Sequence, residues 1–212
     1  DIYGPSMPTM FDIENARHRN ININGESKMD AVERYGVKIL SIGFFAKADQ
    51  AVVWRGPMAS KAVNQLLRDA HWGDLDFMII DLPPGTGDIH LSTVQAVPIT
   101  GAVIVSTPQN VALADARKGV AMFKLENIKV PILGMIENMA YFTPPELPDN
   151  KYYLFGQDGV RNLANELQVP FLGELPLVQS IRESGDVGRP AALQEGTAVQ
   201  KQFETITRNM VA

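Results

Sequence analysis

Apolar and polar positions follow two periods along most of this chain. Short uninterrupted apolar runs are typical of strands buried on both faces, whereas apolar residues that recur every three or four positions are typical of amphipathic helices. The runs predict strands at residues 37–42, 76–81, 101–107, 130–136 and 171–175. The helical period predicts helices at about residues 58–70, 89–97, 110–126, 160–167 and 197–211, and a helical turn at 179–185. Asp88 and Asn110 can cap the helices that begin beside them.

Strands that alternate with helices predict an α/β fold with a mostly parallel sheet and helices on both faces. We interpret residues 1–212 as one domain, because no internal repeat, low-complexity tract or linker divides them. Residues 12–34 are polar and irregular, and we interpret them as a surface excursion with at most one short edge strand. Ligands of such sheets bind outside the carboxyl ends of the strands. Four loops are therefore expected at one edge: 82–88, 108–110, 137–143 and 176–180.

The segment 76–88 carries the most informative local pattern. Four apolar residues lead into Asp81, and Pro83 cannot continue a hydrogen-bonded ladder. Gly85 then allows a sharp turn or a close approach to a ligand. In P-loop NTPases, a carboxylate at the end of a central strand holds Mg²⁺ beside the terminal phosphates. A buried strand that simply ends in a polar loop explains this segment about equally well.

Composition narrows the class of protein. The chain has 212 residues, of which 45% are hydrophobic and 20% charged, so it is long enough to bury a substantial core and is not intrinsically disordered. The net charge of −5 argues against a broad nucleic-acid-binding face, and no apolar run is long enough to span a bilayer. The absence of cysteine excludes disulfides and thiolate metal sites within this chain, which fits a cytoplasmic protein.

Several motifs together resemble one known family. They are Asp1-Ile-Tyr-Gly-Pro-Ser-Met-Pro8, Trp54-Arg-Gly-Pro-Met-Ala-Ser-Lys61, Ile80-Asp-Leu-Pro-Pro-Gly-Thr-Gly-Asp-Ile-His-Leu91, Thr107-Pro-Gln109, Ile136-Glu-Asn-Met139 and Ile181-Arg-Glu-Ser-Gly-Asp-Val-Gly-Arg-Pro190. The set resembles the Mrp/ApbC family, whose members are relatives of MinD and the nitrogenase iron protein among the deviant-Walker-A P-loop ATPases. The resemblance covers nearly the whole chain, and the string beginning at Ile80 is its most specific part.

The resemblance implies phosphate and metal roles for four residues. Asp1 matches the switch I aspartate, which positions the attacking water near the γ-phosphate. Asp81 matches the Walker B aspartate, which reaches Mg²⁺ through water. Pro83 and Gly85 belong to switch II, residues 82–88, whose backbone senses the γ-phosphate. Without the family, the alternative explanation of Asp1 is a frayed terminus.

The resemblance also implies a base site. Asn138 matches the asparagine that reads the adenine edge with its amide, and Leu175, Pro176 and Leu177 match the segment that packs along the adenine. From the residues alone, Asn138 is better explained as a turn residue that follows a strand.

Two features of the family are absent from residues 1–212. The family places a glycine-rich P-loop with two lysines before Asp1, and no Gly-x-x-x-x-Gly-Lys-Ser/Thr pattern occurs here. We therefore interpret the chain as N-terminally truncated, lacking the P-loop strand and helix, and expect this fragment alone to be inactive. Many members also carry a Cys-x-x-Cys pair, where two subunits can share an iron–sulfur cluster, but residues 140–148 contain none. The histidines have no ligand-like spacing: His18, His71 and His90.

The resemblance implies that the complete protein is an ATPase that uses ATP and Mg²⁺ and carries or assembles iron–sulfur clusters. It implies a homodimer with cluster donor and client proteins as partners, and neither nucleic acid nor membrane. An alternative is a MinD- or ParA-like positioning ATPase, in which ATP controls partner or membrane binding. The last helix disfavours a membrane anchor, because its only charged residues are Lys201, Glu204 and Arg208. A partner-binding ATPase without cluster chemistry is a third possibility.

Overall fold

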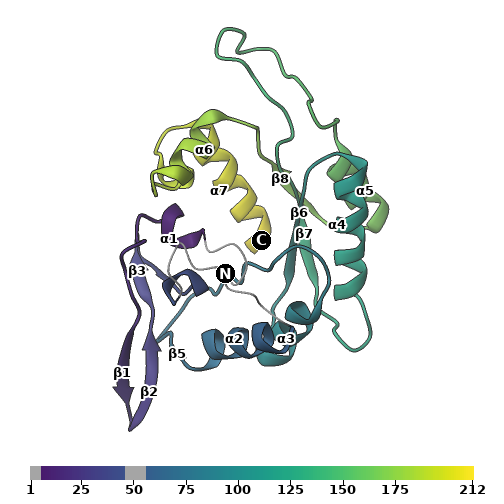
Figure 1. Cartoon of the computed structure of the whole chain (residues 1–212). Coiled ribbons are helices and arrows are strands. Elements are labelled where there is room, and N and C mark those ends of the chain that lie inside the picture. The colour runs from purple at the N-terminus through teal and green to yellow at the C-terminus, as the bar shows by residue number, and fades with distance from the viewer. Residues whose placement is uncertain (1–5, 46–55) are drawn as a thin grey trace. The chain divides into compact units, whose positions relative to one another are not determined.

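The computed structural model describes residues 6–45 and 56–212, and the chain falls into two compact units. Unit 1 comprises Asp1–Pro98 with Gly185–Arg189, and unit 2 comprises Ile99–Ser184 with Pro190–Ala212. Figure 1 labels the elements of both units. No helix in the described part of the chain is long and apolar enough to cross a membrane.

Unit 2 is built around a parallel sheet in the order β6-β7-β8, with helices on both faces (Figure 1). Helix α4 packs on β6 and α5 on β7, whereas α7 packs against β8 and β7 from the other side. The predicted α/β class with a parallel sheet is confirmed. The strands are β6 (Ala102–Ser106), β7 (Ile132–Glu137) and β8 (Phe171–Glu174), and the helices are α4 (Asn110–Phe123), α5 (Gly159–Leu167), α6 (Gln179–Asp186), the 3₁₀ helix η2 (Ala191–Leu193) and α7 (Ala198–Val211).

Helix α7 closes one face of the sheet. The Thr197 hydroxyl accepts the Gln200 N–H at 3.1 Å, which caps the helix and fixes its start. Ile206 packs with Leu172 of β8, and Phe203 and Met210 join this cluster. Val105 of β6, expected in a fully buried strand, is 57% exposed because α7 packs against β8 and β7.

The close approach of β7 and β8 depends on Gly134. A Cβ atom at this position would lie 2.5 Å from Leu172 Cγ and 2.9 Å from the Pro170 carbonyl oxygen, which belongs to the backbone leading into the neighbouring strand. Gly134 therefore permits Leu172 to be buried against the sheet, where it supports α7.

Unit 1 contains two antiparallel hairpins, β1–β2 and β3–β4, and β2 also pairs in parallel with the short β5. Helices α2 and α3 pack together through Ala59, Ala62, Val63 and Ile89. The elements are α1 (Met7–Met10), β1 (Arg19–Ile23), β2 (Glu26–Asp30), β3 (Val32–Arg34), β4 (Val37–Ile39), the 3₁₀ helix η1 (Ile42–Phe44), α2 (Gly56–Arg68), β5 (Ala70–His71) and α3 (Asp88–Ala96).

Residues 12–34 are more regular than expected, because they contain three strands instead of one. Asn24 (φ 53°) and Gly25 (φ 89°) both lie in the left-handed region, which is the requirement of a tight two-residue hairpin turn. The Asn22 side chain also accepts the Gly25 N–H at 2.9 Å. The predicted strand at 37–42 is shortened to β4, which pairs antiparallel with β3 and not within the parallel sheet.

The predicted strand at residues 76–81 does not form a ladder. Residues 77–80 have no strand partner in the described part of the chain, and Phe77 and Ile79 are 70% and 77% exposed. An apolar run predicts burial, but a strand also needs a neighbouring strand to pair with its backbone N–H and C=O groups. The sequence of the run itself does not show which strand that neighbour is.

The predicted helix caps are displaced by one residue. Asp88 and Asn110 are the first residues of α3 and α4, and the cap positions belong to Gly87 and Gln109. Asp88 still places a negative charge in the first turn of α3, where the helix dipole favours it.

We expect Gly134→Ala to destabilise the protein by about 1–3 kcal/mol, because the methyl group would overpack the β7–β8 contact. Chemical denaturation would measure the change in the free energy of unfolding. Gly119→Ala is the matched control. It lies within α4, its Cβ would meet only Ile104 Cδ1 at 3.7 Å, and we expect it to stabilise by about 0.5–1 kcal/mol. Equal effects of the two substitutions would contradict the packing argument.

Candidate site at the carboxyl edge of the sheet

Two predicted base-site segments lie beside each other in unit 2. The Leu175 N–H donates to the Glu137 carbonyl at 2.8 Å, the Ala140 N–H to the Leu175 carbonyl at 2.9 Å, and the Leu177 N–H to the Tyr141 carbonyl at 2.8 Å. The pairing of β7 with β8 thus continues past both strand ends. Asn138 is thereby held next to the segment from Leu175 to Leu177, although its role in reading a base stays a prediction.

The Asn138 side chain is half-buried and partly engaged. Its carbonyl oxygen accepts the Met139 N–H at 3.0 Å, and its own backbone N–H donates to the Ser106 carbonyl at 2.8 Å. Because the side-chain oxygen has a local donor, the NH₂ group is the part that can donate to a ligand. Met139 has φ 53°, so the chain turns sharply just after Asn138.

The three residues expected to pack along a base differ in exposure. Leu175 and Pro176 are buried, and Leu175 belongs to the cluster of Leu172 and Ile206 beneath α7. Leu177 is half-buried. Leu177 and the backbone of this segment therefore present the surface that a planar ligand could contact.

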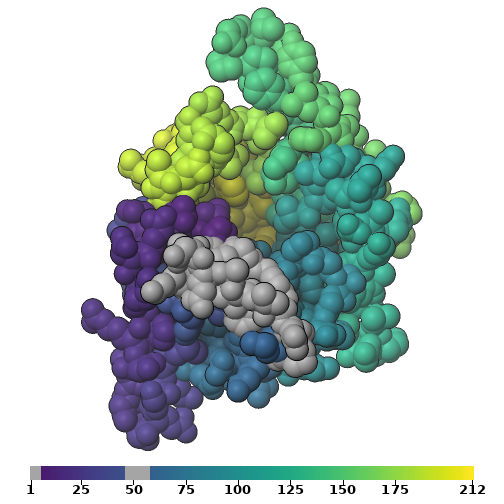
Figure 2. Space-filling view, viewed as in Figure 1, coloured from purple at the N-terminus to yellow at the C-terminus, as the bar shows by residue number. Residues whose placement is uncertain are grey.

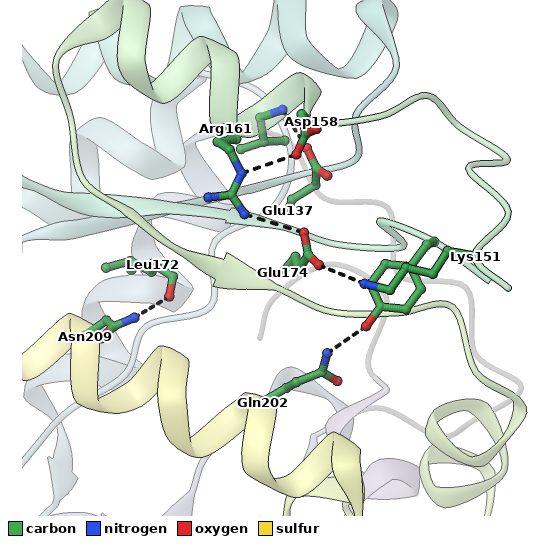
Figure 3. Close-up of polar contacts among 10 residues, drawn as sticks. Glu137, Lys151, Asp158, Arg161, Leu172, Glu174, Gln202 and Asn209 are labelled. Carbon is green, nitrogen blue, oxygen red and sulfur yellow. Dashed lines mark hydrogen bonds and ion pairs between the residues drawn. The ribbon is translucent and has the colours of Figure 1, made fainter. Parts of the chain in front are cut away.

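Glu137 is a residue that the sequence reasoning missed. Its side chain is 2% exposed, and its Oε2 atom accepts the Val160 N–H at 2.7 Å (Figure 3). Burial raises the pKa of the Glu137 carboxyl. The nearby Asp158 and Glu174 carboxylates raise it further, while the Val160 N–H and the Arg161 guanidinium act to lower it. The sequence signal that could have identified Glu137 is its place at the end of an apolar strand, because a charged residue that is buried there needs a hydrogen-bonding partner.

An ion-pair network surrounds Glu137 at the surface (Figure 3). Arg161 lies 3.2 Å from Asp158 and 3.7 Å from Glu174, and Lys151 lies 3.7 Å from the same Glu174. The Lys151 ammonium also lies 3.7 Å from the centre of the Tyr141 ring. Exposed ion pairs of this kind contribute little stability individually.

That loop, residues 142–158, projects from the rest of unit 2 (Figures 1 and 2). An isolated bridge between Phe142 and Tyr152 closes its base. Leu147 and Leu154 are 48% and 60% exposed, so the loop presents apolar surface to solvent.

Loop 108–110 reaches the same edge from β6. A Cβ atom on Gly159 would overlap the Pro108 carbonyl oxygen, so this loop lies directly on the start of α5. Beyond it, residues of α4 and α5 line an open cavity of about 790 Å³, and the Arg117 guanidinium of α4 pairs with the Glu166 carboxylate of α5 on its wall at 2.7 and 2.8 Å. Three of the four loops predicted to share an edge thus follow β6, β7 and β8.

The fourth predicted loop, residues 82–88, belongs to unit 1. Asp81 and Gly85 are exposed, and Pro83 is half-buried. Leu82 packs against the apolar cluster of α2 and α3, which anchors the start of the loop. Gly85 has φ 101°, a backbone conformation that residues other than glycine rarely adopt.

His90 lies beneath this loop and is 4% exposed. Burial lowers the pKa of its imidazole, and the backbone carbonyls of Gly87 and Pro83 act in the opposite direction. The first turn of α3 thus buries an imidazole whose charged form is disfavoured by burial.

The expected metal and catalytic residues are only partly described. Asp1 lies outside the described residues, as do Trp54 and Arg55 of the second motif. The described residues contain no group of three or more histidine, cysteine, aspartate or glutamate side chains that could hold a metal ion. The exposed Asp81 carboxylate fits an Mg²⁺ ion held mainly by water and nucleotide phosphates, because such ions take few protein ligands.

Known proteins provide an independent comparison. A family model described as ParA: NUBPL iron-transfer P-loop NTPase matches residues 1–211. An iron–sulfur cluster carrier protein from Synechocystis sp. is 43% identical over 212 residues, which are 100% of this chain and 60% of that protein. The iron–sulfur cluster transfer protein NUBPL from Dictyostelium discoideum is 43% identical over 212 residues, which are 100% of this chain and 64% of that protein. This chain therefore spans less than two thirds of the length of these relatives.

Among solved structures, a nucleotide-binding protein from Archaeoglobus fulgidus in complex with ADP is similar with a TM-score of 0.75. The two are 32% identical, and the match covers 94% of this chain and 74% of the other. This likeness confirms the fold class predicted from the sequence.

We expect Glu137→Gln to stabilise the protein increasingly as the pH rises from about 4 to about 8. The folded state raises the pKa of Glu137, so the wild type has its full stability below the unfolded pKa and loses part of it as the buried carboxyl ionises. Glutamine keeps an acceptor for the Val160 N–H and cannot ionise. Urea denaturation at several pH values would measure the difference.

The exposed Glu195→Gln substitution is the control, for which we expect little change in the free energy of unfolding at any pH in this range. A constant difference between wild type and Glu137→Gln across the range would contradict the assignment of a costly buried charge.

Proposed function

Because this chain belongs to the ParA family of NUBPL iron-transfer P-loop NTPases, we propose that the complete protein binds ATP with Mg²⁺ and hydrolyses it to ADP and phosphate. We propose that this cycle serves the carriage or assembly of iron–sulfur clusters, the function named for its relatives from Synechocystis and Dictyostelium. One family model spans residues 1–211, which supports the proposal that both units belong to one domain.

The observation that carries the proposal is that the residues on either side of Asn138 hydrogen-bond to the segment from Leu175 to Leu177 at the carboxyl edge of a parallel sheet. Nucleotides bind at this edge in open α/β sheets. The Asn138 NH₂ group could donate a hydrogen bond to the edge of a purine base. Leu177 and the neighbouring backbone could pack against the face of the same base.

We propose that Asp81 and the loop after it serve the phosphates. Mg²⁺, when bound with the nucleotide, supplies positive charge beside the terminal phosphates. Asp81 is exposed at the start of the loop, which suits a carboxylate that reaches the ion through water. Gly85 lacks a Cβ atom, so the backbone N–H groups around it can approach the γ-phosphate closely. Asp1 would orient the attacking water, and phosphate-binding lysines would come from outside residues 1–212.

Iron–sulfur clusters are cargo in this proposal. The chain contains no cysteine, and cluster iron usually binds thiolates. Cluster ligands would therefore come from other parts of the protein or from donor and client proteins, and a homodimer could share one cluster. The alternative of a MinD- or ParA-like positioning ATPase is not favoured, because the relatives at 43% identity are named as iron–sulfur cluster proteins.

We expect Asp81→Asn in the full-length protein to lower ATP turnover by about a hundredfold or more, because the charge that orients the metal is lost. Stability should change little, since the side chain is exposed. Steady-state phosphate release and thermal unfolding would measure the two quantities. Asp76→Asn, also exposed and at the other end of the same apolar run, is the matched control and should keep wild-type turnover. A variant of Asp81 that is fully active but unfolds more easily would indicate a structural role instead.

We expect residues 1–212 alone to lose iron and sulfide after anaerobic reconstitution and desalting, because they supply no thiolate ligand. The full-length protein, reconstituted in parallel, is expected to retain both if it contains cysteines elsewhere. Iron and sulfide analysis with visible absorption spectroscopy would measure retention. A stoichiometric cluster with a charge-transfer band in residues 1–212 would show that this part binds clusters without cysteine.

A further inference from the structure

Glu137 connects two elements that meet at the predicted base site. It is the last residue of β7, where it pairs with Ser106 of β6 and Glu174 of β8 in the central position of the sheet. Its side chain turns towards the start of α5, as Figure 3 shows, and is almost completely buried there. The next residue along the chain is Asn138, the predicted base-reading amide.

The start of α5 has no cap of its own. Asp158 occupies the cap position with φ 55°, and its side chain makes no capping hydrogen bond. The first N–H groups of a helix need acceptors, and a carboxylate is a favourable one because of the helix dipole. Glu137 supplies this acceptor from the sheet, at 2.7 Å from the Val160 nitrogen.

This hydrogen bond adds to the contacts that hold the chain at Glu137 and Asn138. The Asn138 N–H is held by the Ser106 carbonyl, and the Glu137 carbonyl is held by the Leu175 N–H. The start of α5 is in turn packed on the Pro108 carbonyl through Gly159. Met139, the next residue, has φ 53°, a left-handed conformation that costs free energy in a non-glycine residue.

We infer that Glu137 is a positioning residue for nucleotide binding, which caps α5 from the sheet and thereby holds the Asn138 amide in the orientation that meets the base. This inference rests on the proposed function. The carboxylate acts through its acceptor oxygen and not through contact with the ligand, so a neutral side chain of the same shape and with the same acceptor is expected to replace it.

The test compares ligands with and without a base. In the full-length protein, calorimetry would measure the affinity of Glu137→Ala and Glu137→Gln for Mg²⁺-ATP and for Mg²⁺ with inorganic tripolyphosphate, which offers the phosphates alone. We expect the alanine variant to bind ATP about tenfold more weakly, the effect of one lost buried hydrogen bond, and to bind tripolyphosphate unchanged. Glutamine should restore ATP affinity to within about twofold of wild type.

Glu166→Ala is the matched control, because it removes an exposed carboxylate from the other end of α5 and leaves the cap intact. It should change neither affinity. If the alanine variant of Glu137 does not fold, Glu137→Asp keeps the charge but shortens the reach to Val160, and the same selective loss is expected. Equal loss for ATP and tripolyphosphate, no loss at all, or failure of glutamine to restore binding would overturn the inference.

A second measurement needs no nucleotide. Hydrogen exchange followed by mass spectrometry should show faster amide exchange in Glu137→Ala at both residues 138–141 and residues 159–163, and exchange no faster than wild type in Glu137→Gln. Faster exchange confined to residues 159–163 would show that Glu137 only caps α5 and would overturn its positioning role. A wild type that binds no ATP would refute the proposed function, and the exchange pattern would still decide the role of Glu137.

Discussion

The pairing of backbone N–H and C=O groups beyond the ends of the strands is the constraint on which the candidate site depends. Buried peptide groups need partners, and in unit 2 the parallel ladder supplies them past the last residues of β6, β7 and β8. Ser106 holds the peptide of Asn138, and Leu175 holds the peptides of Glu137 and Ala140. The residues just beyond the strand ends therefore have a hydrogen-bonded backbone. Polar side chains on such a backbone can be held in the orientation that a ligand contact requires.

Local periodicity predicted the elements that depend on local pattern and missed those that depend on distant partners. The helices α4, α5 and α7 follow from an amphipathic period within each segment, and the strands of unit 2 follow from apolar runs that alternate with those helices. Residues 77–80 have the same kind of run but no strand partner in the described part of the chain, so the pattern alone gave a wrong strand. The β1–β2 hairpin was missed although Asn24 and Gly25 are a strong turn signal. Residues 20–23 of β1 alternate asparagine and isoleucine, but β2 has a single apolar residue, Met29, so its pattern does not indicate a second strand.

The residues of the candidate site also divide into those that a local motif indicated and those that depend on a distant partner. Asn138 and the segment from Leu175 to Leu177 were found through motifs, and the structure places them together. Glu137 stands inside the motif at residues 136–139 but received no role, because a glutamate reads as a surface residue until its burial is known. Its partner, Val160, is 23 residues away, and the absence of a capping bond from Asp158 is a property of the folded backbone. A cap donated by another element leaves no local pattern.

The two segments that we propose to contact the nucleotide, one in each unit, differ in how many hydrogen bonds hold them. A switch needs one part that keeps the ligand and another that responds to its γ-phosphate. The edge around Asn138 is anchored by ladder hydrogen bonds and by the buried Glu137 carboxylate. The loop after Asp81 is exposed from Pro84 to Asp88 and is anchored mainly where Leu82 meets the α2–α3 cluster. Under the proposed function, loss of the γ-phosphate would change the loop at small cost, whereas a rearrangement of the edge around Asn138 would require breaking buried hydrogen bonds.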